Sequence, residues 1–315
     1  MIAGQRLKHA IFERCALAVR GAANALTARV IPFMLAGLAL SDGIAVALTP
    51  EQEQELARRI SAGARPQVIQ LNETRIEDYK RPPDGPDGLE FLVVRSPWDE
   101  PIKVADRDLA MRTLQVGGGP GPNAIFVGFS GGGGHCCYTA HLIWIEGRAH
   151  HQEVPLAESD LKLEARNGPP RLRFNDYAFA DWHTAPAMTP APPVVLAYDP
   201  RVGEYRLDPD AMRKPPPSDA ALADHAAEIR KKYAALGDDD LDPSLWAAML
   251  DLIYNGNADP ARTLLDAAWP ETKPGKEKFL ADFTRQLWAG ETWRHFNLGR
   301  LLEADQAFPR PPAVQ

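Results

Sequence analysis

The pentapeptide Lys214-Pro215-Pro216-Pro217-Ser218 divides the chain into two regions of different composition. The residues before it are rich in glycine, proline and β-branched side chains, whereas those after it are rich in alanine and leucine. Consecutive prolines continue neither a sheet nor a helix interior, because proline fixes φ and lacks a backbone N–H. We therefore place a linker at 215–218, between a β-rich domain at 65–214 and an α-helical domain at 219–305.

Short apolar runs alternate with clusters of turn-forming residues in the first of these regions. This spacing predicts a mostly antiparallel β-rich region, arranged as a sandwich, a barrel or a propeller-like assembly. The expected strands are 67–71, 90–94, 124–129, 136–145, 161–164, 171–174, 194–198 and 204–207. Together with the helices that follow, they predict an α+β fold.

The apolar residues after the linker recur at helical spacing. We expect helices at 220–236, 243–254, 260–268, 276–289 and 292–304, followed by a disordered tail at 306–315. Ser218 or Asp219 is placed to cap the first of these helices, and Asp242 or Ser244 the second. The result is a small α-helical region after the β-rich one.

Four residues of this helical region, Gly256, Ala261, Leu265 and Ala268, are spaced as in the second half of a helical hairpin. The spacing resembles a tetratricopeptide-type half-repeat, in which the glycine opens the turn and the small residues let two helices approach. The resemblance covers about one hairpin, and Trp246 and Tyr254 fall outside that family's register. It implies an αα-hairpin and a peptide-binding role.

The N-terminus combines a basic stretch, an apolar run at 30–40 and a small-x-small triplet, Ala45-Val46-Ala47. This combination is typical of a secretory signal peptide, which we place at 1–47. The apolar run is shorter than the roughly 20 residues that a membrane span needs, and no later segment is long enough. An N-terminal helix is expected at 48–64, because Thr49, Pro50 and Gln52 form a capping-box start. The mature protein is therefore expected to be secreted or periplasmic, without an integral membrane segment.

The chain has 315 residues and a formal net charge of −7, and the signal segment carries more basic than acidic side chains. The mature protein is thus acidic, which excludes nucleic acid as an expected partner, because nucleic-acid binding depends on Lys and Arg. Only Cys136 and Cys137 remain after residue 47. Two cysteines are too few for a disulfide framework, so the fold must depend mainly on its core.

A serine lies in the segment Gly128-Phe129-Ser130-Gly131-Gly132, which matches the G-x-S-x-G pattern of α/β-hydrolases. Ser130 is thus a candidate nucleophile, and Asp181 and His183 are candidate partners that follow it in chain order. A nucleophile elbow requires a helix directly after the serine. Further glycines follow instead, so a glycine-rich hairpin is the competing interpretation.

The residues after these glycines carry other reactive groups, His135, Cys136 and Cys137. His135 and Cys137 lie on one face of the expected strand and could chelate a metal, with further ligands from His150, His151, Asp181 or His183. His135 and His141 would be about 20 Å apart, too far to share one ion. Alternatively, Cys136 and Cys137 could form a vicinal disulfide, which would be strained and would disturb the strand.

The segment 176–183 places aromatic residues and an Asp–His pair beside a proline-rich loop. Trp98 and Trp182 could supply stacking faces for a peptide or a sugar. We expect an exported, non-catalytic protein- or peptide-binding module that needs no cofactor. A secreted serine hydrolase using Ser130 is the alternative, and a metal-dependent hydrolase or metal-binding protein is the third hypothesis.

Overall fold

The structure of the protein is a computed structural model. The residues that it describes are 48–71, 73–81, 88–106, 109–115, 124–130, 138–164, 171–185, 188–237, 240–302 and 307–311, with the backbone alone at 71, 110–115 and 124–130. The expected signal peptide lies outside these residues. The described residues belong to one compact unit, which contains both the β-rich and the helical regions.

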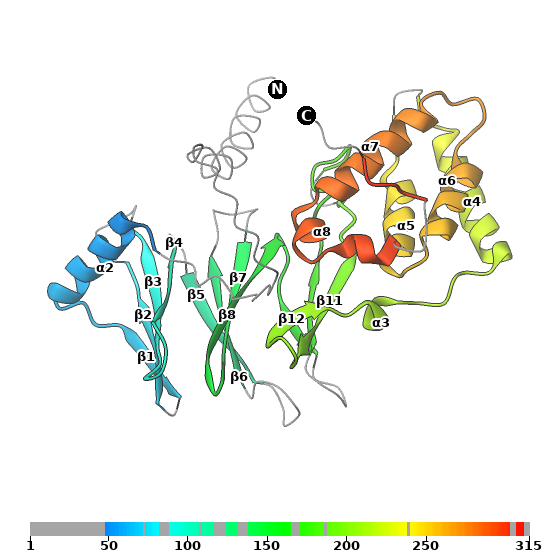
Figure 1. Ribbon diagram of the computed structural model, residues 1–315. Helices are drawn as coiled ribbons and strands as arrows, with labels where there is room; N and C mark the ends of the chain where they lie inside the picture. The colour runs from blue at the N-terminus through cyan, green and yellow to red at the C-terminus, as the bar shows by residue number, and fades with distance from the viewer. Residues whose placement is uncertain are drawn as a thin grey trace, which may run out of the picture. The chain divides into compact units, whose positions relative to one another are not determined.

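The β-rich part consists of three antiparallel four-stranded sheets, each formed by strands consecutive in the chain (Figure 1). Sheet A contains β1 (Gln67–Leu71), β2 (Thr74–Tyr79), β3 (Glu90–Arg95) and β4 (Ile102–Asp106). Sheet B contains β5 (Leu109–Gln115), β6 (Ala124–Ser130), β7 (Tyr138–Glu146) and β8 (Arg148–Ala157). Sheet C contains β9 (Lys162–Glu164), β10 (Arg171–Asn175), β11 (Pro193–Asp199) and β12 (Glu204–Leu207). The α+β prediction is confirmed, and each sheet is open rather than closed into a barrel.

The helices follow the sheets in sequence, except for α2 (Pro50–Ser61), which precedes them. They are α3 (Pro209–Met212), α4 (Asp219–Tyr233), α5 (Pro243–Tyr254), α6 (Ala258–Ala268), α7 (Lys276–Ala289), α8 (Glu291–His295) and the 3₁₀ helix η2 (Leu298–Leu302). Between α5 and α6 the chain turns at Gly256, whose φ of 78° favours glycine. Ala261, Leu265 and Ala268 are buried on α6.

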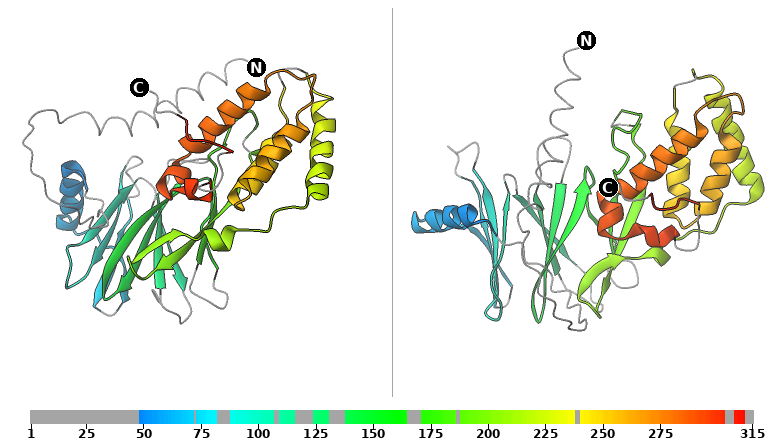
Figure 2. Two further views of the ribbon diagram at one scale, coloured as in Figure 1. Left: turned by 45° about the vertical axis from the view of Figure 1, so that its right-hand side comes forward. Right: turned by 45° about the horizontal axis from the view of Figure 1, so that its top comes forward.

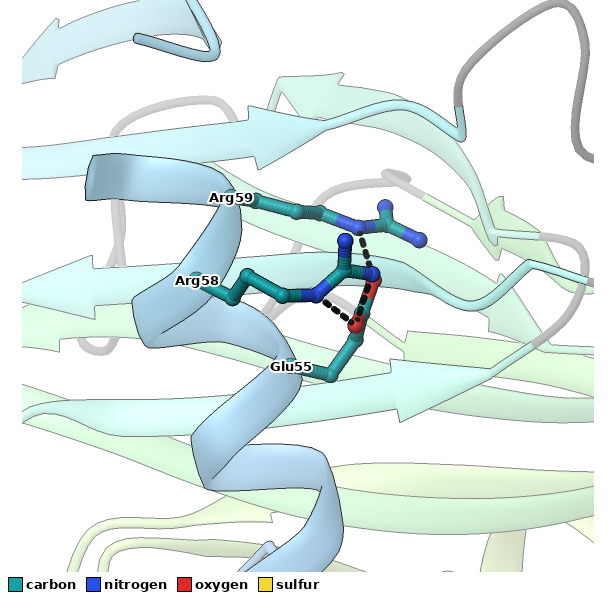
Figure 3. A network of polar contacts seen from close by, with 3 residues as sticks. All are labelled: Glu55, Arg58 and Arg59. Atoms are coloured by element: carbon teal, nitrogen blue, oxygen red, sulfur yellow. Dashed lines mark hydrogen bonds and ion pairs between the residues drawn. The ribbon is translucent and has the colours of Figure 1, made fainter. Parts of the chain in front are cut away.

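Helix α2 begins with the expected capping box, in which Thr49 and Gln52 exchange hydrogen bonds. It covers one face of sheet A, where Leu56 packs with Phe91 and Val93. Glu55 forms ion pairs with Arg58 and Arg59 on the same helix, as Figure 3 shows. The Arg59 guanidinium also lies over the Phe91 ring, 5.2 Å from its centroid, so this side chain joins helix to sheet.

Strand β7 is buried on both faces. Ala140, Leu142 and Trp144 belong to the largest core cluster, which also contains residues of sheet C and the C-terminal helices. Ile143 points to the opposite side and packs with sheet A residues such as Leu92. Alternate residues of β7 therefore face opposite sides, and the side that carries Ile143 is covered by sheet A.

The segment 176–185 lies between β10 and β11 in the chain, and its contacts with the helices join them to sheet C. Asp176 is buried and accepts a hydrogen bond from the Tyr254 hydroxyl of α5 at 2.5 Å. Gln286 of α7 donates to the Ala178 carbonyl at 2.5 Å. These contacts explain why the sheets and helices share one core in spite of the proline-rich linker.

Part of the expected disordered tail is also packed into this core. Phe308 is buried against the Phe283 ring, and its carbonyl accepts a hydrogen bond from Trp288 Nε1. The prediction of disorder is therefore wrong at 307–311, because an aromatic side chain anchors a segment that is otherwise rich in proline.

Candidate functional site

Two histidines and a carboxylate lie together on the β7–β8 hairpin (Figure 2 shows both strands). His141 of β7 is directly opposite Glu153 of β8, and His151 is opposite Ile143. Directly opposite residues share one face of an antiparallel pair, and so do residues two positions along each strand. The three side chains therefore share the face of sheet B on which Ile143 packs against sheet A.

The ligand-type atoms of this cluster converge. His141 Nδ1 lies 3.2 Å from His151 Nε2 and 3.5 Å from Glu153 Oε1. All three residues offer a ligand atom within 4.8 Å of the others. The two imidazole rings are nearly parallel, at an interplanar angle of 12°. Such an arrangement fits either a hydrogen bond between the rings or a shared cation.

Burial keeps both histidines neutral. It lowers the pKa of His141 to about 3, helped by the neighbouring His151, and it lowers the pKa of His151 to about 4. Burial also raises the pKa of Glu153, and repulsion from the Glu291 carboxylate acts in the same direction. At neutral pH both imidazoles therefore keep a lone pair that no proton occupies.

A pocket of about 680 Å³ adjoins this cluster at the edge strand β8. Its walls come from β8, from the edge strand β12 and from the turn between α8 and η2. The lining residues are His151, Gln152, Glu153, Glu204, Tyr205, Arg206, Leu207, His295, Phe296, Asn297 and Arg300. The pocket thus combines acidic, basic, amide and apolar groups.

The Gln152 side chain of β8 forms hydrogen bonds to β12, the other edge strand that flanks this pocket. Its amide donates to the Tyr205 carbonyl at 2.7 Å and accepts from the Tyr205 N–H at 2.8 Å. The side chain thereby pairs with β12 as a neighbouring strand would. The pocket consequently lies between two edge strands that the Gln152 side chain joins.

The predicted nucleophile Ser130 ends β6, where the backbone pairs antiparallel with Leu109 of β5 and Thr139 of β7. The next described element is strand β7, whereas a hydrolase elbow leads into a helix. The Ser130 side chain lies outside the described part of the structure, and so do His135, Cys136 and Cys137. The metal pair, the vicinal disulfide and the serine nucleophile at these positions therefore stay predictions.

Asp181 and His183 are exposed on the segment 176–185, and both have left-handed backbone conformations, with φ of 57° and 52°. Trp182 lies between them and packs against Trp246 and Phe279 of the helices. Trp98, by contrast, is 72% exposed on the turn between β3 and β4. Trp182 is thus packed among aromatic side chains, whereas Trp98 is open to solvent, and their role as stacking faces for a ligand stays a prediction.

The cluster of His141, His151 and Glu153 was not predicted as a unit, although His151 was considered as a supplementary ligand. The sequence pattern does not predict a strand at 148–157, so it gives little indication that His151 and Glu153 share a face. His151 and Glu153 are two residues apart, which would have indicated one face had that strand been recognised. Their pairing with His141 depends on the hairpin register.

The chain was compared with protein-family models, curated proteins and solved structures, and nothing matched. Within the described residues, every helix is too short or too polar to cross a lipid bilayer. The function must therefore be inferred from the chemistry of the cluster and its pocket.

Proposed function

We propose that the protein is an exported, non-catalytic binding protein whose ligand is a peptide or protein segment held in the pocket between β8, β12 and the α8–η2 turn. The observation that carries this proposal is the lining of the pocket by two neighbouring edge strands. Edge strands expose backbone groups that an extended segment can use, apart here from those of Tyr205, which the Gln152 amide already pairs. The N-terminal signal pattern supports export.

The chemical character of the lining supports a peptide as the ligand. Tyr205, Leu207 and Phe296 offer apolar contacts, whereas Glu204 and Arg300 offer charges of both signs. A volume of about 680 Å³ is within the usual range of roughly 300–1,000 Å³ for ligand pockets. A peptide presents apolar side chains, amides and charges together, as this mixture requires.

The lining also favours binding over covalent catalysis. It includes histidine and glutamate, which can act as bases, but no serine, threonine, cysteine or lysine side chain among its described residues. Of the side chains that serve as covalent nucleophiles, these residues therefore offer only carboxylates, histidines and a tyrosine. The lack of a serine or cysteine among them supports recognition over the serine-hydrolase alternative.

A displayed library of random peptides, selected against the untagged full chain, tests this proposal. We expect enriched peptides, and we expect Arg300→Glu to weaken their binding at least about tenfold, because it reverses the charge of a lining residue. Arg294→Glu is the matched control, since Arg294 is exposed on α8 but does not line the pocket. Equal effects of both substitutions, or no enrichment, would contradict peptide binding here.

A further inference from the structure

Three ligand-type atoms on the β7–β8 hairpin are spaced as in a metal centre. In a tetrahedral zinc site with bonds of about 2.0–2.2 Å, ligand atoms lie about 3.3–3.6 Å apart. The separations from His141 Nδ1 to His151 Nε2 and to Glu153 Oε1 are 3.2 and 3.5 Å. Two of the separations thus match those around one tetrahedral ion, and all three ligand atoms lie within 4.8 Å of one another.

The electrostatic environment also favours a cation. No lysine or arginine of the described chain forms an ion pair with Glu153, whose one ion-pair partner of opposite type is His141. Glu153 also experiences repulsion from Glu291. A divalent cation would provide a positive charge beside the Glu153 carboxylate.

We propose that His141 Nδ1, His151 Nε2 and the Glu153 carboxylate bind one divalent transition-metal ion, with Zn²⁺ as the best-matched ion. Imidazole nitrogen and carboxylate oxygen are ordinary zinc ligands, and a site with three protein ligands keeps a fourth position for water or a ligand group. His151 and Glu153 are also among the residues that line the pocket, which places the proposed ion beside it. The proposal does not require the pocket to bind a peptide.

The position of the ligands gives such an ion a defined framework. All three ligands belong to paired strands of one hairpin, whose register fixes His141 against Glu153. His141 is 5% exposed, and its neighbour Ile143 is fully buried against sheet A. Ligands on rigid, packed strands are held more precisely than ligands on loops.

Metal binding is tested on the full chain without a histidine tag, stripped with a chelator and titrated with Zn²⁺ in the absence of peptide. We expect one equivalent to bind and to raise the melting temperature of the protein. His141→Ala, His151→Ala and Glu153→Gln should each weaken binding by at least about 100-fold, since even substitutions around metal ligands cost about 10- to 100-fold.

The matched control is His150→Ala. His150 precedes His151 on the same strand, but it faces the other side of sheet B, where it stacks on Trp144 at a centroid distance of 5.3 Å. This substitution should leave the zinc affinity within about twofold of wild type. Glu153→Gln guards against misfolding as the cause of any loss, because the Glu153 side chain is 41% exposed and the change keeps its size.

Cobalt(II) substitution distinguishes this site from the thiols at Cys136 and Cys137. We expect the visible absorption of a four- or five-coordinate cobalt site without the near-ultraviolet charge-transfer band of a Co–thiolate bond, and no change in the spectrum of Cys136→Ser/Cys137→Ser. The proposal is overturned if the wild-type chain binds no stoichiometric zinc, if the ligand variants bind as tightly as wild type, or if binding depends on the cysteines. The first of these results would leave the two histidines as a hydrogen-bonded pair and would not affect the peptide experiment.

Discussion

A buried polar residue, Asp176, joins sheet C to the C-terminal helices. Asp176 is 3% exposed and accepts hydrogen bonds from the Tyr254 hydroxyl at 2.5 Å and from the Ala178 N–H at 2.9 Å. Burial raises its pKa, although the hydrogen bonds from Tyr254, Ala178 and Thr292 oppose this effect. One carboxyl group thus links the segment between β10 and β11 to α5 and α8.

We predict a pH-dependent effect of Asp176→Asn on the free energy of unfolding. The substitution removes one of two acceptor oxygens, so a buried donor loses its partner at a cost of about 1–3 kcal/mol. Because the folded-state pKa of Asp176 is raised, its contribution to stability is present below the unfolded pKa of about 3.9 and is lost as the pH rises through the folded pKa. The cost of Asp176→Asn should therefore be larger at pH 4 than at pH 7.

Urea unfolding of wild type and Asp176→Asn at these two pH values measures the difference. Asp210→Asn is the control, because the Asp210 side chain is 91% exposed and should give the same small effect at both. A cost that grows between pH 4 and pH 7 would show that the ionised carboxylate is favoured in the folded protein, contrary to the direction given above.

The residues of the candidate site show what a single sequence can and cannot provide. His135 and Cys137 were chosen because they lie two positions apart on an expected strand. His141 lies on that same strand, but its partners His151 and Glu153 come from β8. Such a cluster depends on which residues pair across the hairpin, and this register was not accessible from spacing along the chain.

The edge strands β8 and β12 are joined by hydrogen bonds from a side chain to the backbone. The Gln152 side chain of β8 pairs with both backbone groups of Tyr205 on β12, at 2.7 and 2.8 Å. Tyr205 is 1% exposed, so water cannot easily replace these hydrogen bonds. This single amide therefore connects sheet B to sheet C and protects an edge.

We predict that Gln152→Ala destabilises the protein by about 2 kcal/mol, since each buried group left without a partner costs about 1–3 kcal/mol and some relaxation occurs. Gln152→Glu should be at least as harmful, because a carboxylate oxygen would then face the Tyr205 carbonyl. Chemical denaturation measures both. Arg148→Ala, an exposed change on the same strand, should stay within about 0.5 kcal/mol of wild type. A Gln152→Ala effect of that same small size would mean that the pairing with Tyr205 contributes little.

Elements with explicit end signals were predictable, whereas charged strands were not. The bounds of α5 and α7 agree with the expected helices, and Asp242 caps α5 as expected. The strands β2, β4, β5 and β8 were missed. Strand β2 has the sequence Thr-Arg-Ile-Glu-Asp-Tyr, whose charged residues are unusual in a strand. Glu77 and Asp78 nevertheless belong to the sheet, because each is buried in an ion pair. Tertiary pairing therefore overrides local strand propensity in these segments.

The described part of the molecule is a succession of layers, in which α2 covers sheet A, sheet A packs on sheet B, and sheet B shares the main core with sheet C and the helices. Sheet A contacts sheet B through a small apolar cluster that includes Ile143. Polar contacts supplement it at Leu109, whose N–H donates to Glu90 at 2.8 Å and whose carbonyl accepts from Lys80. This junction is smaller than the main core, so the first layers should open at a lower free energy than the rest.

Two neighbouring residues of β7 test this layered stability, because both are fully buried and they face opposite sides of the strand. Ile143 packs toward sheet A and Leu142 toward the main core. Truncation of either to alanine should cost about 2–5 kcal/mol. Hydrogen–deuterium exchange should show Ile143→Ala accelerating exchange mainly in α2 and sheet A, and Leu142→Ala accelerating it mainly in sheet C and α4–α7. Identical acceleration of all these segments by both variants would mean that the layers unfold only together, and the small junction would then be as strong as the main core.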